Sequence, residues 1–164
     1  MVLKTLRSEY RNTSRRYTMK RFLLVTLVLV LALAACAPKA QESSAPVLKV
    51  SDGNVEKTYT ADDLKALGES QADFKGVTYV GVPLTVLLED AGIDSTALTA
   101  VKAVAVDGFT ANYESALFTR EDTLVAYARM DGPLGEDEGS FRMVLTDQEG
   151  KMNPRELVEI IAIP

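Results

Sequence analysis

Histidine and tryptophan are absent from the 164-residue sequence, and cysteine occurs once, as Cys36. Without histidine, neither a Ser-His-Asp nor a Cys-His catalytic site can form, and a histidine-ligated haem is excluded. A single cysteine cannot make an internal disulfide, and without histidine it cannot complete a structural zinc site. Any metal would have to be held by carboxylate and carbonyl oxygens.

Charge of each sign is unevenly distributed along the chain. Residues 1–35 carry seven basic side chains and one acidic side chain, whereas residues 36–164 carry eleven basic and 22 acidic side chains. The length, with 47% hydrophobic and 25% charged residues, suits one ordinary globular domain. A net charge of −11 after residue 35 argues against nucleic acid as a partner and against adhesion to anionic lipid through basic patches.

An apolar run of fourteen residues, 22–35, follows the basic segment. A membrane-spanning helix needs about 20 apolar residues, whereas the apolar part of a signal peptide needs roughly 7–15. Cys36 comes directly after Leu33-Ala34-Ala35, an arrangement that resembles the lipobox of bacterial lipoproteins. Residues 1–35 are therefore predicted to be a lipoprotein signal peptide, with Met19 as a second possible start, and Cys36 the lipidated residue. The alternative is a short transmembrane anchor with an incidental cysteine.

Residues 36–46 are small, polar and bounded by proline, as in a flexible tether. The folded domain is expected over residues 47–164, which matches the usual size of one domain. A diacylglyceryl anchor would hold this domain outside the cytoplasm, in the bacterial cell envelope. Ala37 lacks the aspartate that commonly follows the lipidated cysteine of inner-membrane lipoproteins, which favours the outer membrane where the cell has one.

Strand-like patterns dominate the domain, and the helical patterns are short. Strands are expected at residues 47–51, 55–59, 74–80, 101–106, 109–113, 123–129, 141–145 and 157–163. Helices are expected after the capping-box-like Thr60 and after Pro83, with a helical turn at 114–118. The charged segment 136–138 is expected to be a solvated turn. These elements predict an α+β fold with a mixed sheet.

Three motifs in order carry a family resemblance. The sequence reads Tyr79-Val-Gly-Val-Pro-Leu84 before a leucine-rich helix, then Val104-Ala-Val-Asp-Gly-Phe109, then Gly132-Pro-Leu134 followed by Gly139 and Arg142-Met-Val144, with an apolar strand at the end. Together they resemble the molybdopterin-binding domain of the sulfite oxidase fold, over about residues 47–164. The resemblance implies this fold for the domain.

Catalytic members of that family hold molybdenum through a protein cysteine thiolate, and residues 47–164 contain no cysteine. The chain is also similar to small exported pterin-binding regulators, which act on a membrane signalling partner. The resemblance therefore implies a non-catalytic binding module for a pterin or a related heterocycle, without molybdenum. One alternative is a degenerate scaffold that binds another envelope protein. A more distant one is a molybdopterin-dependent oxidoreductase with an unusual metal ligand.

A pterin pocket needs a flat apolar surface, acceptors for the 2-amino and N3–H groups and a donor for the carbonyl. Asp107 could accept the two donors, since it lies at a strand end beside glycine. The remaining candidates are the rings of Phe109 and Tyr113 for stacking, Arg129 and Arg142 as donors, and Asn112 in either role.

Each candidate also has a structural interpretation. Asp107 is equally well explained as the first residue of a type I′ turn. Phe109 is better explained as a core residue, and for Tyr113 the core and the site have equal weight. Arg129 shares an alternating strand face with Val125, which would place it at a sheet edge, and the same alternation would point Arg142 to solvent.

Overall fold

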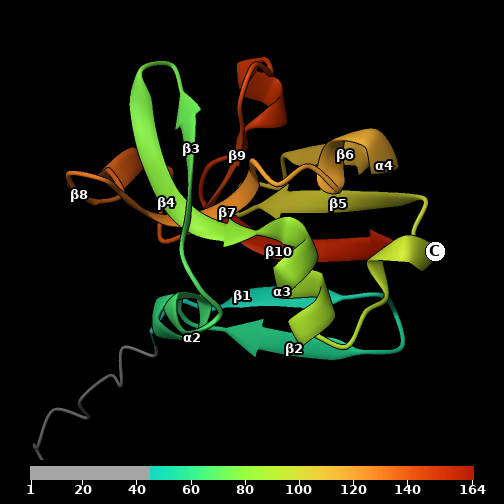
Figure 1. Cartoon of the computed structure of the whole chain (residues 1–164). Helices are drawn as coiled ribbons and strands as arrows, with labels where there is room; N and C mark the ends of the chain where they lie inside the picture. Colours follow the sequence, from blue (N-terminus) through green and yellow to red (C-terminus); the bar gives the residue numbers. More distant parts are fainter. Residues whose placement is uncertain (1–44) are drawn as a thin grey trace, which may run out of the picture. The chain divides into compact units, whose positions relative to one another are not determined.

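The computed structural model describes residues 45–164. The predicted signal peptide, Cys36 and all but the last two residues of the tether lie outside the described residues. Within the described part of the chain, no helix is both long and apolar enough to cross a bilayer. Figure 1 shows two sheets with short helices, which confirms the α+β class and the mixed sheet.

The first sheet, sheet A, has five strands in the order β2-β1-β10-β5-β6. β1 runs parallel to β10, and every other pair is antiparallel. The first and last strands of the described residues are therefore neighbours in this sheet, since β10 lies between β1 and β5. The strands are β1 (Leu48–Ser51), β2 (Glu56–Tyr59), β5 (Ala100–Ala105), β6 (Thr110–Glu114) and β10 (Leu157–Ile163).

The second sheet, sheet B, is wholly antiparallel, in the order β3-β4-β7-β8, and β9 also pairs with β7. Lys75 and Gly76 join β3 to β4 with positive φ at both residues, 53° and 78°, as a two-residue type I′ turn requires. The predicted strand through Gly76 was therefore wrong, because the chain reverses there. The strands are β3 (Ser70–Phe74), β4 (Val77–Pro83), β7 (Thr123–Arg129), β8 (Gly132–Pro133) and β9 (Arg142–Leu145).

Short helices connect the strands and pack against the sheets. The Thr60 hydroxyl accepts from the Asp63 amide and the Asp63 carboxylate accepts from the Thr60 amide, so the predicted capping box is confirmed. The leucine stripe after Pro83 is buried, and Gly92 ends that helix with φ 82°. The helical segments are α2 (Ala61–Ala66), α3 (Leu84–Asp90), η2 (Ser95–Ala97), α4 (Ser115–Phe118), η3 (Glu136–Glu138) and η4 (Gly150–Met152).

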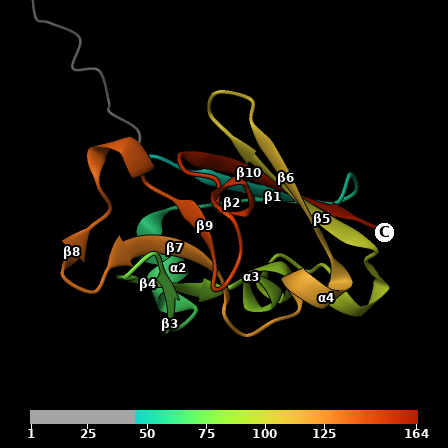
Figure 2. The ribbon, with the colours of Figure 1, turned by 90° about the horizontal axis from the view of Figure 1, so that it is seen from above.

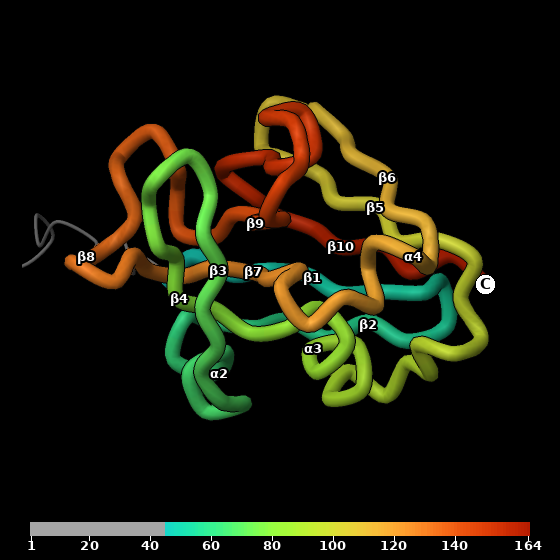
Figure 3. Tube along the Cα trace, turned by 45° about the horizontal axis from the view of Figure 1, so that its top comes forward, coloured from blue at the N-terminus to red at the C-terminus, as the bar shows by residue number. Residues whose placement is uncertain are grey.

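The two sheets bury different numbers of faces. Figure 2 shows α3, α4 and sheet B on one side of sheet A, and the main core lies between them. Sheet B has a second, smaller cluster on its other face, built around Tyr79, Leu124 and Val144. The tip of the β3–β4 hairpin rises beside the segment that follows β9, as Figures 1 and 3 show.

Candidate functional site

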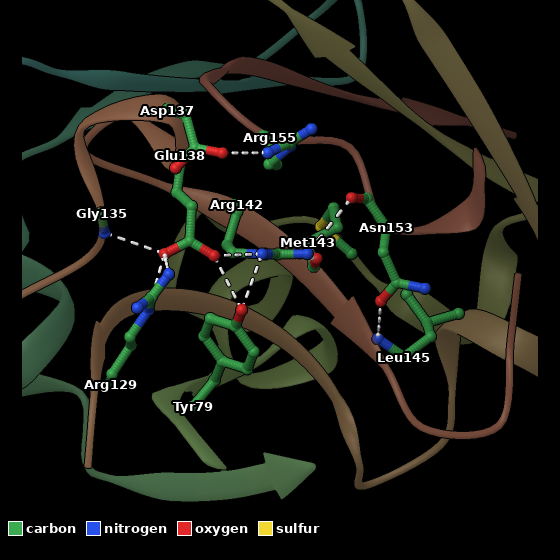
Figure 4. Close-up of polar contacts among 10 residues, drawn as sticks. All are labelled: Tyr79, Arg129, Gly135, Asp137, Glu138, Arg142, Met143, Leu145, Asn153 and Arg155. Atoms are coloured by element: carbon green, nitrogen blue, oxygen red, sulfur yellow. Dashed lines mark hydrogen bonds and ion pairs between the residues drawn. The ribbon is translucent and has the colours of Figure 1, made fainter. Parts of the chain in front are cut away.

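A buried carboxylate joins three strands of sheet B. Glu138 of η3 accepts hydrogen bonds from the Tyr79 hydroxyl at 2.7 Å, from Arg129 Nε at 2.8 Å and from the Gly135 amide at 2.8 Å. Arg142 Nη1 also donates to Glu138 and, at 2.8 Å, to the Tyr79 hydroxyl. Figure 4 shows the side chains converging on Glu138. The prediction of a solvated turn at 136–138 was wrong for Glu138, which is buried.

Arg129 reaches this carboxylate because of a β-bulge. The register between β4 and β7 shifts at Val80/Gly81, so Arg129 lies opposite Tyr79. Simple alternation along β7 would place Arg129 on the same face as Val125, but the bulge moves it to the other face of sheet B. Gly81 permits the bulge: a Cβ on this residue would lie 2.3 Å from the Val125 carbonyl oxygen. The glycine of the Gly-Val-Pro-Leu motif thus helps to place an arginine 48 residues later.

Arg142 is buried rather than exposed to solvent, which corrects the structural interpretation made from alternation. Its guanidinium carbon lies 4.5 Å from the centroid of the Tyr79 ring and 5.5 Å from that of Phe74. A guanidinium over aromatic faces gains cation–π stabilisation. Arg142 is buried because β9 has apolar neighbours on both of its faces.

The network keeps Glu138 ionised. Burial by itself raises the pKa of this carboxyl, but the hydrogen bonds from Tyr79, the Gly135 amide, Arg142 and Arg129 outweigh burial and lower the pKa to about 2. Burial and the bond to Glu138 raise the pKa of Tyr79. At neutral pH the cluster therefore holds one negative and two positive charges.

One cleft, the arginine cleft, opens over this network. Its volume is about 380 Å³, within the range of small-molecule sites. Three of the four arginines of residues 45–164 line it, together with Lys75. The lining residues are Phe74, Lys75, Val77, Tyr79, Arg129, Asp137, Glu138, Arg142, Gly150, Asn153 and Arg155.

A second cleft, the aromatic cleft, has a volume of about 360 Å³. Phe109 lies on its wall with 44% of its surface exposed, so the interpretation of Phe109 as a core residue was wrong. Asp107 accepts the Phe109 amide at 2.9 Å through Oδ1, which leaves lone pairs for other donors. The lining residues are Ala105, Asp107, Phe109, Asp137, Gly150, Asn153, Pro154, Arg155 and Glu156.

The two clefts share a wall formed by Asp137, Gly150, Asn153 and Arg155. Asn153 is buried and holds the wall in place. Its Oδ1 accepts the Leu145 amide at 2.6 Å, and its Nδ2 donates to the Glu149 carbonyl at 3.0 Å. The structure thus brings four of the predicted site residues, Asp107, Phe109, Arg129 and Arg142, to two adjoining clefts.

Neither Asn112 nor Tyr113 lines these clefts, and the burial of Tyr113 corrects its prediction as a stacking residue. They alternate on β6, so their side chains point to opposite faces of sheet A. Asn112 is exposed opposite Lys102 on the outer face. Tyr113 is fully buried, its hydroxyl donates to the Met152 carbonyl at 3.0 Å, and burial raises its pKa. A ring enclosed by the core offers no face for stacking.

The sequence interpretation missed Tyr79, Glu138, Asn153 and Arg155. Tyr79 belongs to a sequence motif and Glu138 to a predicted turn, but no local pattern links residues 59 positions apart. For Glu138 the signal was its spacing from Arg142, four residues later and of opposite charge. Asn153-Pro154 carried a weaker signal, since asparagine before proline marks a turn.

A family model described as the oxidoreductase molybdopterin binding domain matches residues 12–163. The chain belongs to this family. The sulfane dehydrogenase SoxCD from Paracoccus pantotrophus is similar in structure, with a TM-score of 0.61 and 19% sequence identity. The match covers 72% of this chain and 38% of the SoxCD chain, so this chain spans well under half the length of that relative. At this identity the likeness shows the fold. No curated protein matches the sequence.

The residues at the two clefts do not fit a thiolate-held molybdenum. The walls present carboxylates, guanidinium groups, an amide and an ammonium group, and residues 45–164 contain neither cysteine nor histidine. No cluster of three or more possible metal-ligating side chains occurs within the described residues. The walls do provide aromatic surface, acceptors and donors, the groups that an organic heterocycle requires.

Proposed function

We propose that this protein is a non-catalytic binding module for a pterin or a related small heterocycle, tethered to the bacterial cell envelope through lipidated Cys36. Membership of the oxidoreductase molybdopterin binding domain family supports a pterin as the ligand class. The exposed ring of Phe109 beside the Asp107 carboxylate carries the proposal, because a heterocycle can stack on the ring while its N–H groups donate to the carboxylate.

The absence of cysteine and histidine from the domain supports binding without redox chemistry. The protein would then signal to a membrane signalling protein in the envelope whether its ligand is bound.

The proposed lipid anchor rests on the sequence alone: the fourteen-residue apolar run and Cys36 after small residues. Incorporation of labelled palmitate tests it, since the protein should take up the label and Cys36→Ala should not.

Calorimetric titration with oxidised and reduced pterins tests the ligand, with molybdenum measured on the same sample. We expect saturable binding of one pterin without metal. Phe109→Ala and Asp107→Asn should each weaken binding at least tenfold, since each removes a contact to the ring. Asn112→Ala is the matched control, because Asn112 lies on the outer face of sheet A. Equal weakening by all three variants, or no binding to folded protein, would overturn the proposal.

A second candidate function is a scaffold that binds another envelope protein. Val106, Phe109 and Val158 are exposed, and they lie at the β5–β6 turn and at the bulge at the start of β10. Exposed apolar groups gathered at one end of a sheet favour protein contact. Folded protein that binds no pterin but captures its envelope partner through these side chains would favour the scaffold.

A further inference from the structure

The edge strands of the two sheets differ in how they are protected. An edge strand is a template for pairing with another chain unless charge, proline or a covering segment blocks it. Among the described residues, β2 carries Glu56 and Lys57, and β3 carries Asp73. β8 is only the pair Gly132–Pro133, and the outward amides of β9 are bonded to the segment that follows η4. These edges are therefore closed to a further strand.

β6 is the exception. It is the last strand of sheet A, beside β5 (Figure 1). From Phe109 to Tyr113 the chain contains no charged residue, proline or glycine, and the one charge of β6 is at its end, at Glu114. None of the devices that protect the other edges of the described domain is present here, so β6 is open to pairing.

Two residues of β6 direct their backbone groups away from the sheet. The Ala105 amide donates to the Phe109 carbonyl at 2.9 Å, so by alternation the odd-numbered residues of β6 are the ones that bond to β5. Thr110 and Asn112 therefore point their N–H and C=O groups outward, and no backbone group elsewhere in residues 45–164 bonds to them. Each of the two residues offers one donor and one acceptor to a further strand.

These two residues complement each other in a second copy of the chain. Antiparallel pairing of two β6 strands about a two-fold axis at Ala111 sets Thr110 of each copy opposite Asn112 of the other, and this uses all of their free donors and acceptors. Glu114 then faces Gly108, so no like charges are opposed. An axis at Asn112 would instead require the backbone of Glu114, which already caps α4.

An exposed ring at the start of β6 favours the same occupant. Phe109 is 44% exposed, and pairing about Ala111 sets it opposite Tyr113 of the second copy, where part of its surface leaves water. We infer that two copies of this chain associate through β6, so that sheet A continues from one copy into the other. Addition of a strand at an open edge is an established mode of recognition, and here the added strand is β6 itself.

Sedimentation equilibrium tests this inference. The sample is the chain from residue 36 with Cys36→Ala, which carries neither lipid nor thiol and keeps every described residue. We expect the mean mass to rise toward that of a dimer as the concentration approaches about 1 mM, since a strand edge buries less surface than a standard interface. High salt should strengthen the association, because residues 45–164 carry ten basic and 21 acidic side chains and the copies repel each other.

Variants at the edge separate backbone pairing from general charge. Thr110→Lys should leave the protein monomeric, because lysine blocks an edge strand, even though the variant is less negative and repels its copy less. Asn112→Pro should also be monomeric and stay folded, because the N–H that it removes points away from β5. Thr58→Lys is the matched control, since it makes the same substitution at an exposed position of the other edge strand of sheet A.

Amide hydrogen exchange locates the contact, since the amides of Thr110 and Asn112 should exchange more slowly as the dimer forms. Protein that stays monomeric at the highest concentration overturns the inference. So does a dimer that survives Thr110→Lys, or one that Thr58→Lys weakens as much. A monomer whose β6 amides become protected only when envelope extract is added would assign the edge to another protein, and would also overturn the inference of a second copy.

Discussion

Sheet A and sheet B differ in the number of faces they bury. Sheet A packs against the main core with one face, and its outer face carries half-exposed and exposed side chains such as Lys102 and Asn112. Sheet B contributes to the main core with one face and to the smaller cluster around Tyr79, Leu124 and Val144 with the other. The second buried face holds Arg142 and Glu138, so the polar groups of the arginine cleft depend on packing that sheet A lacks.

The difference shows how a charged side chain becomes part of a site. On sheet A, an outward-facing charged residue stays in contact with water even when it is paired, as Lys49 is with Glu159 at 2.6 Å. On sheet B, a residue that points away from the main core is covered by the second, smaller cluster. A charged side chain there destabilises the fold unless it is paired and hydrogen-bonded. A fixed, paired charge can line a cleft with a defined geometry.

The largest expected effect comes from removing the buried negative charge of sheet B. We expect Glu138→Gln to lower the free energy of unfolding by about 4 kcal/mol, because Arg142 would stay buried without its counter-charge. Urea unfolding followed by circular dichroism measures the change. Glu136→Gln makes the same charge change at an exposed position of the same turn, and should change stability by less than about 0.5 kcal/mol.

A double variant distinguishes an uncompensated charge from a simple loss of contacts. Glu138→Gln combined with Arg142→Met removes both charges, so it should be more stable than Glu138→Gln alone. If the double variant is less stable than the single one, the buried pair is not what links η3 to β9.

The loss of stability at low pH that comes from Glu138 should be smaller than the loss caused by Glu138→Gln, and it should arise in sheet B. The pKa of Glu138 is about 2 in the folded protein, below its ordinary value of 4.5. The carboxyl therefore binds a proton more weakly when folded, and its contribution is complete above pH 4.5 and lost as the pH falls toward 2. About 2 kcal/mol should be lost by pH 3.

Other carboxyls with lowered pKa values titrate in the same range, so measurements on the wild type alone cannot isolate the contribution of Glu138. They are Asp52, Asp63, Asp90, Asp94 and Asp122. The informative quantity is the stability difference between the wild type and Glu138→Gln, which should narrow between pH 6 and pH 3. A difference that stays constant would contradict the assignment of a charged Glu138.

The same contrast explains what could be predicted from the sequence. Alternation and turn residues were sufficient for sheet A, where each strand has one wet face, and for α3 with its leucine stripe. They failed at Arg142, because alternation shows which side chains share a face of β9 but not whether other residues cover that face. They failed at Arg129, because a bulge at Gly81 shifts the register between strands far apart in sequence. The Asp137–Arg155 contact on the shared wall was equally out of reach, since it joins two loops.

The smallest expected effect lies on the outer face of sheet A. Asn112→Thr should change the free energy of unfolding by less than about 0.5 kcal/mol, because Asn112 is exposed and threonine suits a strand. The same variant should bind pterin as the wild type does, since β6 places residue 112 away from both clefts. Urea unfolding and pterin titration check the two statements on one sample. A loss of stability above 1 kcal/mol would mean that this face is covered, in which case sheet A would resemble sheet B and the contrast between them would fail.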